Sequence, residues 1–358
     1  MPTSSLRPDS PGTGWDGPRS VRTESIQALV LVGGRGTRLL PLTETVPKPV
    51  LPLVDRPFLV FFLEWLGDHG VDDVVLACGF RPEVMQEVLS DWAGDLPSLT
   101  WVVEDEPLGT AGAMRHALEH LEDEFLALNG DLLSDFDLGE LIRFHREKGA
   151  RATLGLKEVD DPGPYGLVEL GPEGEVLGFS EKPEDPSALP PPPWLVNAGT
   201  YVLTRSVIED LPPGEALSIE RDVFPRLAGD GMYGLGLEGY WMDIGTPERY
   251  LQATWDLLEG RIETSVPVQT DGVLAVEGSD VSPTATVGPR AVVGEGCSVA
   301  EGADVRGSVL LSGAAIGSKA SVIDSILGAD VVVSEGELVE GEVRGQAPVV
   351  QNRGRDAR

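Results

Sequence analysis

Apolar runs alternate with amphipathic segments between Ile26 and about Arg261. The runs are short and continuous, as in strands buried on both faces of a parallel sheet, and comprise Ile26–Val32, Val71–Cys78, Trp101–Val103 and Phe125–Leu128. The segments between them have the spacing of helices with one apolar side, and comprise Pro57–His69, Arg81–Trp92 and Thr110–Leu121. This alternation predicts an α/β domain over residues 26–262 with a Rossmann-like, mixed and mostly parallel sheet. Ligands of such a sheet gather at the carboxyl ends of its strands.

A six-residue period replaces this alternation in the C-terminal part of the chain. Aliphatic residues recur at Val281, Val287, Val293, Val299, Val305 and Leu311, and after a one-residue slip at Ile316, Val322, Leu327, Val333 and Val339. Such a period predicts a left-handed β-helix of hexapeptide repeats over residues 263–345, with residues 346–358 as a loose tail. We expect the β-helix to support assembly, by packing its coils against a partner subunit in a homo-oligomer or against the catalytic domain of its own chain. Left-handed β-helices also house acyltransferases, but these commonly need a histidine base, and all four histidines precede residue 150.

The composition limits the compartments in which the protein can work and the partners that it can bind. Residues 1–25 are rich in Pro, Gly, Ser and Thr and lack the apolar core of a signal peptide, which predicts a disordered leader. No apolar span is long enough to cross a membrane, and Cys78 and Cys297 are too few for a disulfide framework or a zinc cluster. The net charge of −32 argues against nucleic acid and anionic membranes as partners. We expect a cytoplasmic protein.

A glycine-rich turn follows the first strand, in the string LVGGRGTRLLPLTETVPKP that runs from Leu31 to Pro49. Gly33, Gly34 and Gly36 allow the backbone to fold tightly and to turn several N–H groups toward one anion. Arg38 and Lys48 add positive charge suited to phosphate, in a chain with only five lysines. The turn therefore predicts a phosphate site, although a tight turn with solvated arginines is the alternative.

Two aspartates follow predicted strands in the strings LNGD and GYWMDIGTPERY, namely Asp131 and Asp243. Carboxylates that converge on one cleft can hold Mg²⁺ against phosphate oxygens. An aspartate at a strand end can equally be a helix cap.

Three further strings, PYGLVE, FSEKP and NAGTYV, contain Gly166, Glu181, Lys182 and Asn197. A carboxylate can accept hydrogen bonds from sugar hydroxyls, and a lysine can hold a phosphate. The string EDEPLGTAGAM places Gly109 and Gly112 at the start of a helix, where the backbone could lie against a nucleobase. Surface turns and helix packing are the alternatives.

The full pattern GxGTRLxPLT followed by PKP resembles the signature of the sugar-1-phosphate nucleotidylyltransferases, and the resemblance extends over Ile26–Val343. It implies an Mg²⁺-dependent reaction of a nucleoside triphosphate with a sugar 1-phosphate, with Asp131 and Asp243 as metal ligands and with Arg38, Lys48 and Lys182 at the reacting phosphates. The residues that it implies for the nucleotide are Leu31, Gly33, Gly34, Gly36, Thr37, Arg38, Gly109 and Gly112. Those for the sugar phosphate are Gly166, Glu181, Lys182 and Asn197.

Within this family, the opening LVGG, the string SIERDVFPRL and a hexapeptide domain at this length look most like the enzymes that use GTP and mannose 1-phosphate. Uridylyl-, thymidylyl-, adenylyl- and heptose-specific relatives share the motifs. A non-catalytic subunit that senses nucleotide sugars is a further alternative, although such relatives tend to lose phosphate and metal residues that are all present in this chain.

Overall fold

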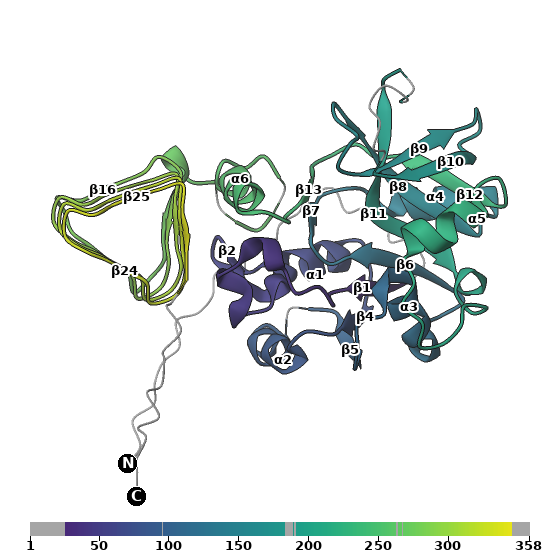
Figure 1. Cartoon of the computed structure of the whole chain (residues 1–358), viewed down its shortest axis with the longest axis horizontal. Coiled ribbons are helices and arrows are strands. Elements are labelled where there is room, and N and C mark those ends of the chain that lie inside the picture. Colours follow the sequence, from purple (N-terminus) through teal and green to yellow (C-terminus); the bar gives the residue numbers. More distant parts are fainter. Residues whose placement is uncertain are drawn as a thin grey trace, which may run out of the picture.

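A mixed sheet covered by helices and a triangular β-helix make up the computed structural model, with helix α6 (Pro247–Leu258) between them (Figure 1). The structure describes residues 26–94, 96–182, 189, 191–262, 264–266 and 268–345. The predicted leader, residues 1–25, and the predicted tail, residues 346–358, lie outside the described residues. Among the described helices, none is long and apolar enough to cross a membrane.

The first half of the main sheet is parallel. Its neighbouring strands, in spatial order, are β6 (Glu124–Asn129), β1 (Gln27–Leu31), β4 (Asp73–Cys78) and β5 (Ser98–Val103). Residues along β1 alternate between two cores, with Ala28 and Val30 on one face and Leu29 on the other. Both faces of the strand are therefore buried, which explains its continuous apolar run.

The second half of the sheet is mostly antiparallel. Strand β11 (Trp194–Thr204) pairs with β6 on one side, and on the other with β8 (Ala152–Val159) and β9 (Gly166–Leu170). Strand β10 (Val176–Glu181) pairs with β9, and β12 (Met232–Gly236) runs parallel to β8. The nine-stranded sheet confirms the predicted mixed, Rossmann-like fold.

Helices cover both faces of this sheet. One face packs on α1 (Phe58–Asp68), α2 (Pro82–Ser90) and α4 (Leu138–Lys148), and the other on α3 (Gly109–His116) and α5 (Phe224–Leu227). Two small sheets lie outside it: β2 (Pro52–Leu53) with β3 (Arg56–Pro57), and β7 (Leu132–Ser134) with β13 (Trp241–Asp243). The helix expected over Thr110–Leu121 is shorter, since a 3₁₀ turn at Leu118–His120 follows α3.

The C-terminal region is a β-helix of three parallel sheets, seen as a triangle in Figure 1. One sheet has β14 (Val273–Ala275), β17 (Ala291–Val293), β20 (Val309–Leu310), β23 (Ile326–Leu327) and β26 (Val343–Arg344). The second has β15 (Asp280–Val281), β18 (Ser298–Val299), β21 (Ala315–Ile316) and β24 (Val332–Val333). The third has β16 (Thr286–Val287), β19 (Asp304–Arg306), β22 (Ser321–Ile323) and β25 (Leu338–Glu340). The predicted hexapeptide β-helix is confirmed; self-association through it stays a prediction.

The slip in the six-residue period lies one position earlier than the sequence indicated. Leu310, not Leu311, pairs with Val293 in the preceding coil and with Leu327 in the following one. The cause is a tight corner at Gly307, where φ is 56° and an added Cβ would lie 2.1 Å from Oδ1 of Asp324. The left-handed conformation favours glycine, although Asp324 adopts it at the equivalent corner of the next coil. Both corners use one residue fewer than the corner of the first coil.

The β-helix packs on the segment that carries the glycine-rich turn. Leu39 and Leu42 share a buried cluster with Val292, Val309 and Ile326 of the β-helix. A Cβ added at Gly345 would lie 2.9 Å from Cβ of Pro41, and one at Gly328 would lie 3.2 Å from Cδ2 of Leu42. The two parts of the chain are thus in direct contact next to the predicted phosphate site.

Candidate active site

The glycine-rich turn folds over Lys48. Gly36 has a φ of 62°, and a Cβ added there would lie 2.9 Å from Cβ of Lys48. The hydroxyl of Thr43 donates a hydrogen bond of 2.9 Å to the carbonyl oxygen of Gly36, which holds the turn in place. Two features favour glycine at this position, namely the left-handed backbone conformation and the close approach of the Lys48 side chain. Gly34 and Thr37 are exposed, with nothing within 4 Å of a Cβ added at Gly34.

Lys48 is buried beside the first predicted metal ligand. Only 8% of the residue is exposed, and Nζ donates a hydrogen bond of 2.8 Å to Oδ2 of Asp131. Asp131 lies two residues after the end of β6, at the carboxyl end of the parallel strands, and 38% of its side chain is exposed. The ion pair thus joins a buried ammonium group to a carboxylate that solvent or a ligand can reach.

Asp243 lies next to Asp131 because their strands pair. Strand β13 ends at Asp243 and pairs with β7, which begins directly after Asp131, and the N–H of Ile244 donates a 3.0 Å hydrogen bond to the carbonyl oxygen of Asp131. Burial and then the negative charge of Asp131 raise the pKa of Asp243, and nearby cations oppose this rise. Two residues 112 positions apart in sequence therefore converge on one site.

Two arginines approach the second carboxylate. A Cβ added at Gly245 would lie 2.6 Å from a terminal nitrogen of Arg38, so the guanidinium group of Arg38 lies over the turn that follows Asp243. The Nη1 atom of Arg249 lies 3.4 Å from Oδ2 of Asp243. Arg38 was predicted, whereas Arg249 was missed; its position in the same string, on the first turn of α6, was the available signal.

The chemistry of these two carboxylates fits Mg²⁺. Oδ1 of Asp243 is buried, and within the described part of the chain it has no hydrogen-bond partner. The described residues contain no group of three or more metal-ligating side chains. Mg²⁺ prefers hard oxygen ligands and is commonly held by one or two carboxylates together with substrate phosphates and water. A pair of aspartates with one unpartnered oxygen therefore fits this ion.

The predicted sugar side lies where β10 ends and β9 begins, since Glu181 pairs with Gly166. A Cβ added at Gly166 would lie 2.9 Å from Oε2 of Glu181, so the carboxylate covers the glycine backbone. Burial raises the pKa of Glu181, and the charge of Glu220 adds to this effect. Lys182 has a φ of 50° and an exposed side chain. Its Nζ lies 3.8 Å from Oε1 of Glu181. Gly166, Glu181 and Lys182 thus lie together.

Asn197 lies at an irregularity of β11, where the register shifts between Asn197 and Tyr201. Its Oδ1 accepts a hydrogen bond from the N–H of Gly199, and its Nδ2 donates one of 2.9 Å to the hydroxyl of Tyr201. The amide carries two N–H groups, and within the described ranges only one of them has a hydrogen-bond partner, so the other can bind a ligand.

Arg249 also connects the two sides. Its Nη2 donates a hydrogen bond to the hydroxyl of Tyr165, whose carbonyl oxygen accepts the N–H of Lys182. Tyr165 further packs edge-on against Trp241 of β13, with ring centroids 5.2 Å apart. The segment that carries Lys182 is thereby tied to the strand that carries Asp243.

Gly109 and Gly112 lie against protein backbone. A Cβ at Gly109 would lie 2.5 Å from the carbonyl oxygen of Leu217, and one at Gly112 would lie 2.4 Å from that of Glu215. The N–H groups of Ala111 and Gly112 also donate hydrogen bonds to Leu217. Both glycines therefore allow close packing of α3 on the segment before Ser218, and nucleobase binding by them stays a prediction.

A buried carboxylate beside the glycine-rich turn was also missed. Glu104 is 8% exposed, and its Oε2 accepts a 2.9 Å hydrogen bond from the N–H of Leu108. Its Oε1 would lie 3.2 Å from a Cβ at Gly33, so the carboxylate faces the turn next to Leu31. No hydrogen bond to Oε1 occurs among the described residues. The charge run EDE concealed this residue, because such runs are usually solvated.

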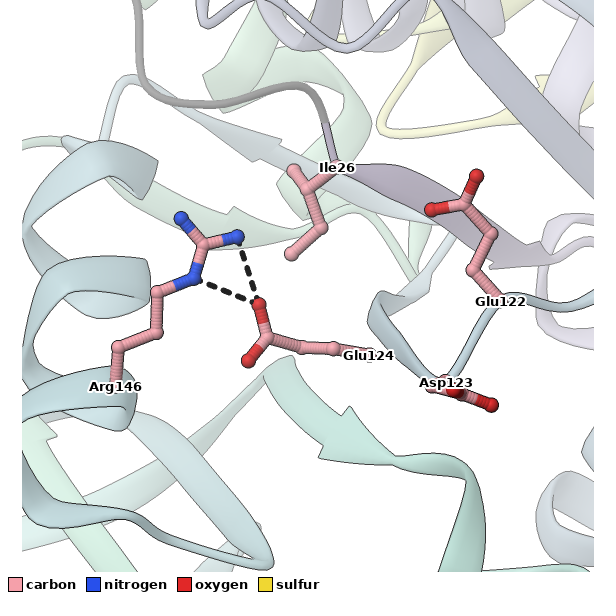
Figure 2. Close-up of a pocket in the computed structure, with 5 residues that line it drawn as sticks. All are labelled: Ile26, Glu122, Asp123, Glu124 and Arg146. Carbon is pink, nitrogen blue, oxygen red and sulfur yellow. Dashed lines mark hydrogen bonds and ion pairs between the residues drawn. The ribbon is translucent and has the colours of Figure 1, made fainter.

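A separate pocket lies away from these residues. It has a volume of about 490 Å³ and is lined by Ile26, Glu122, Asp123, Glu124 and Arg146. Figure 2 shows the guanidinium group of Arg146 directed at Glu124, with Nε and Nη2 each 2.8 Å from Oε1. Ile26 directly precedes β1, and Glu124 is the first residue of β6. This pocket therefore lies at the amino ends of the parallel strands, whereas Asp131 and Asp243 lie at their carboxyl ends. Three carboxylates repel phosphates, and we place no substrate there.

Comparison with known proteins agrees with this geometry. The chain matches the nucleotidyl transferase family over residues 27–260 and the GMPPB C-terminal domain over residues 270–353. It is 40% identical over 242 residues to a mannose-1-phosphate guanylyltransferase of Mycobacterium tuberculosis, an alignment that covers 66% of each chain. It is 36% identical over 267 residues to mannose-1-phosphate guanyltransferase 2 of Candida glabrata, covering 73% of this chain and 72% of the relative.

A solved structure has the same fold in its catalytic part. Crystal structures of HddC from Yersinia pseudotuberculosis, one of them complexed with GMP-PN, cover 64% of this chain and 98% of the other. Their TM-scores are 0.55 and 0.56, at 28% sequence identity. The fold and the site define a nucleotidyltransferase of nucleotide-sugar type. The chain belongs to the nucleotidyl transferase family, and its similar relatives include mannose-1-phosphate guanylyltransferases.

Proposed function

We propose that this chain transfers a guanylyl group from GTP to mannose 1-phosphate, giving GDP-mannose and pyrophosphate. The observation that carries the proposal is the convergence of Lys48, Asp131 and Asp243 with Arg38 at the carboxyl ends of the strands. The guanylyltransferase relatives, and the GMP-PN complex of HddC, support the choice of nucleotide.

The reaction needs positioning and charge neutralisation rather than a covalent intermediate. An oxygen of the sugar 1-phosphate attacks the α-phosphorus of the triphosphate in line, and the bond to the bridging oxygen of the β-phosphate breaks, so that pyrophosphate leaves. Asp131 and Asp243 would hold Mg²⁺, which when bound supplies neutralisation of phosphate charge. Arg38 binds the triphosphate, and Lys48 stabilises the charge that develops at the reacting phosphate. Lys182 orients the attacking sugar phosphate.

Glu104 supplies a physical basis for guanine. Guanine presents two neighbouring donors, N1–H and the 2-amino group, and a carboxylate oxygen directed at this edge can accept from them. Adenine carries no ring N–H at the equivalent position, and the free Oε1 of Glu104 would then face an acceptor. We therefore propose that Glu104 selects GTP against ATP.

Pyrophosphate release with Mg²⁺ tests the proposed function, with GTP, UTP, dTTP and ATP crossed against mannose, glucose and heptose 1-phosphates. We expect release with GTP and mannose 1-phosphate. Preference for another pair of nucleotide and sugar phosphate would leave the mechanism unchanged and would reject GTP and mannose 1-phosphate as the substrates. A folded chain that binds GDP-mannose but releases no pyrophosphate with any pair would support the regulatory alternative instead.

Inosine triphosphate, which lacks the 2-amino group, tests the base contact separately. Wild-type protein should use it with a kcat/KM about 10-fold or more below that for GTP. Glu104→Gln should reduce the difference between the two nucleotides. An unchanged preference in the variant would reject Glu104 as the guanine contact.

A further inference from the structure

A carboxylate outside the predicted set is fixed in position by two hydroxyl groups. Glu220 lies in the π-helical turn Ile219–Val223, which is capped by Ser218. Its Oε2 accepts hydrogen bonds of 2.8 Å from the hydroxyl of Thr110 and 2.7 Å from that of Ser218. The Thr110 hydroxyl in turn accepts the N–H of Ile219. Both hydroxyl protons are therefore committed to one oxygen of Glu220.

The other oxygen of this carboxylate is available. Within the described part of the chain, Oε1 of Glu220 takes part in no hydrogen bond or ion pair, although the residue is half-buried. A half-buried carboxylate of which one oxygen is held and the other is left open is oriented to accept from a ligand. The hydroxyl contacts determine which way it faces.

The turn that carries Glu220 is packed over the sugar side. Phe224, directly after the turn, contacts Phe179 of β10 and Tyr201 of β11, with ring centroids 5.5 and 5.1 Å apart. Phe179 lies two residues before Glu181 on the same face, since a Cβ at Gly166 would meet both side chains. Tyr201 is the hydrogen-bond partner of Asn197.

The electrostatic effects agree with this placement. Burial and then the negative charge of Glu220 raise the pKa of Glu181, and the same two causes raise the pKa of Tyr201. Glu220 is thus near enough to both groups to act on them. Two neighbouring carboxylates favour hydroxyl donors beside them over a further negative charge.

We propose that Glu220 is a specificity-determining residue of the sugar site, whose free oxygen accepts a hydrogen bond from a ring hydroxyl of the sugar phosphate. The inference rests on the proposed function, because it takes the ligand beside Glu181 to be a hexose 1-phosphate. Thr110 is a positioning residue, which orients Glu220 from the first turn of α3.

The test compares Glu220→Gln with Glu215→Gln, a matched change on an exposed glutamate of the same segment. Kinetic constants for GTP and mannose 1-phosphate are measured, and the binding of mannose 1-phosphate is followed by calorimetry, which does not depend on turnover. Glu220→Gln should raise KM and Kd for mannose 1-phosphate about 10- to 100-fold, with the KM for GTP unchanged. Thr110→Val should raise them less, and Glu215→Gln should change neither.

Singly deoxygenated mannose 1-phosphates identify the contact. For the analogue that lacks the hydroxyl read by Glu220, wild type and Glu220→Gln should bind equally, whereas the other analogues should retain the difference. A purely structural role would affect all analogues alike and would lower the melting temperature.

The possible failures can be told apart. If wild type binds and turns over mannose 1-phosphate but Glu220→Gln behaves identically, the sugar contact is rejected and the proposed function stands. If wild type neither binds nor turns over any hexose 1-phosphate, the proposed function is rejected and the contact with it.

Discussion

The Nζ atom of Lys48 lies 2.8 Å from Oδ2 of Asp131, on a lysine that is almost fully buried. The pair joins the glycine-rich segment to the end of β6, and it places a cation beside a carboxylate suited to a metal ion. A buried ammonium next to the site of phosphoryl chemistry can act on developing charge with little screening by water.

Lys48→Met tests this role. Methionine keeps most of the packing and removes the charge, so kcat for pyrophosphate release should fall about 10²- to 10³-fold. Because the carboxylate of Asp131 is partly exposed to solvent, it stays hydrated when the ammonium is removed. We therefore expect the free energy of unfolding to change by only about 1 kcal/mol or less. Retention of kcat with a large loss of stability would show that Lys48 is structural.

Lys182→Ala tests the sugar-phosphate side. Loss of the exposed ammonium should raise KM for mannose 1-phosphate about 10- to 100-fold, because a charge-assisted contact to phosphate is removed. Lys148→Ala is the control, since its side chain pairs with Glu173 at the surface. An unchanged KM for the sugar phosphate together with weaker nucleotide binding would reassign Lys182 to the nucleotide.

Gly345→Val tests whether the β-helix supports the nucleotide side. The new side chain would displace Pro41, which lies 2.9 Å from the position of the Cβ, and with it the segment that carries Arg38. The kcat/KM for GTP should therefore fall about 10-fold while the KM for mannose 1-phosphate stays near its wild-type value. Val332→Ser, at an exposed position of β24, serves as the control. A lower melting temperature with unchanged kinetics would contradict the coupling.

His145 predicts a pH dependence of stability. The residue is 2% exposed, its Nδ1 lies 2.9 Å from the hydroxyl of Thr153, and burial lowers its pKa below the usual 6.5. The unfolded chain therefore takes up the proton first, so this contribution to stability is present above about pH 6.5 and is lost as the pH falls below it. Urea unfolding between about pH 7 and 5 should show a smaller loss for His145→Gln than for wild type. Parallel curves for the two proteins would rule out this linkage.

Elements with a strong period could be predicted from sequence. Strand β1 and helix α1 each begin one residue after and end one residue before the expected range, because a buried strand and an amphipathic helix are both encoded locally. The slip in the β-helix was misplaced by one residue, because Val309, Leu310 and Leu311 are all aliphatic. The shortened corner at Gly307, between β19 and β20, determines which of them faces inward.

Contacts between distant segments of the site could not be predicted from the sequence. Asp131 and Asp243 could be singled out by the strings around them, but their adjacency depends on the pairing of β7 with β13. The string SIERDVFPRL, which contains Glu220, could be singled out, but the orientation of Glu220 depends on Thr110, which is 110 positions away. A glutamate in a charged string carries no local sign of such a partner.

The most direct test of the account is pyrophosphate release from GTP and mannose 1-phosphate with Mg²⁺, measured side by side for wild type, Asp131→Ala and Asp137→Ala. Asp137 caps α4 through the N–H of Glu140, so its loss should cost about 1 kcal/mol of stability without affecting turnover. We predict release by wild type and by Asp137→Ala, and a loss of at least about 10³-fold for a folded Asp131→Ala. Full turnover by Asp131→Ala would contradict the proposed site.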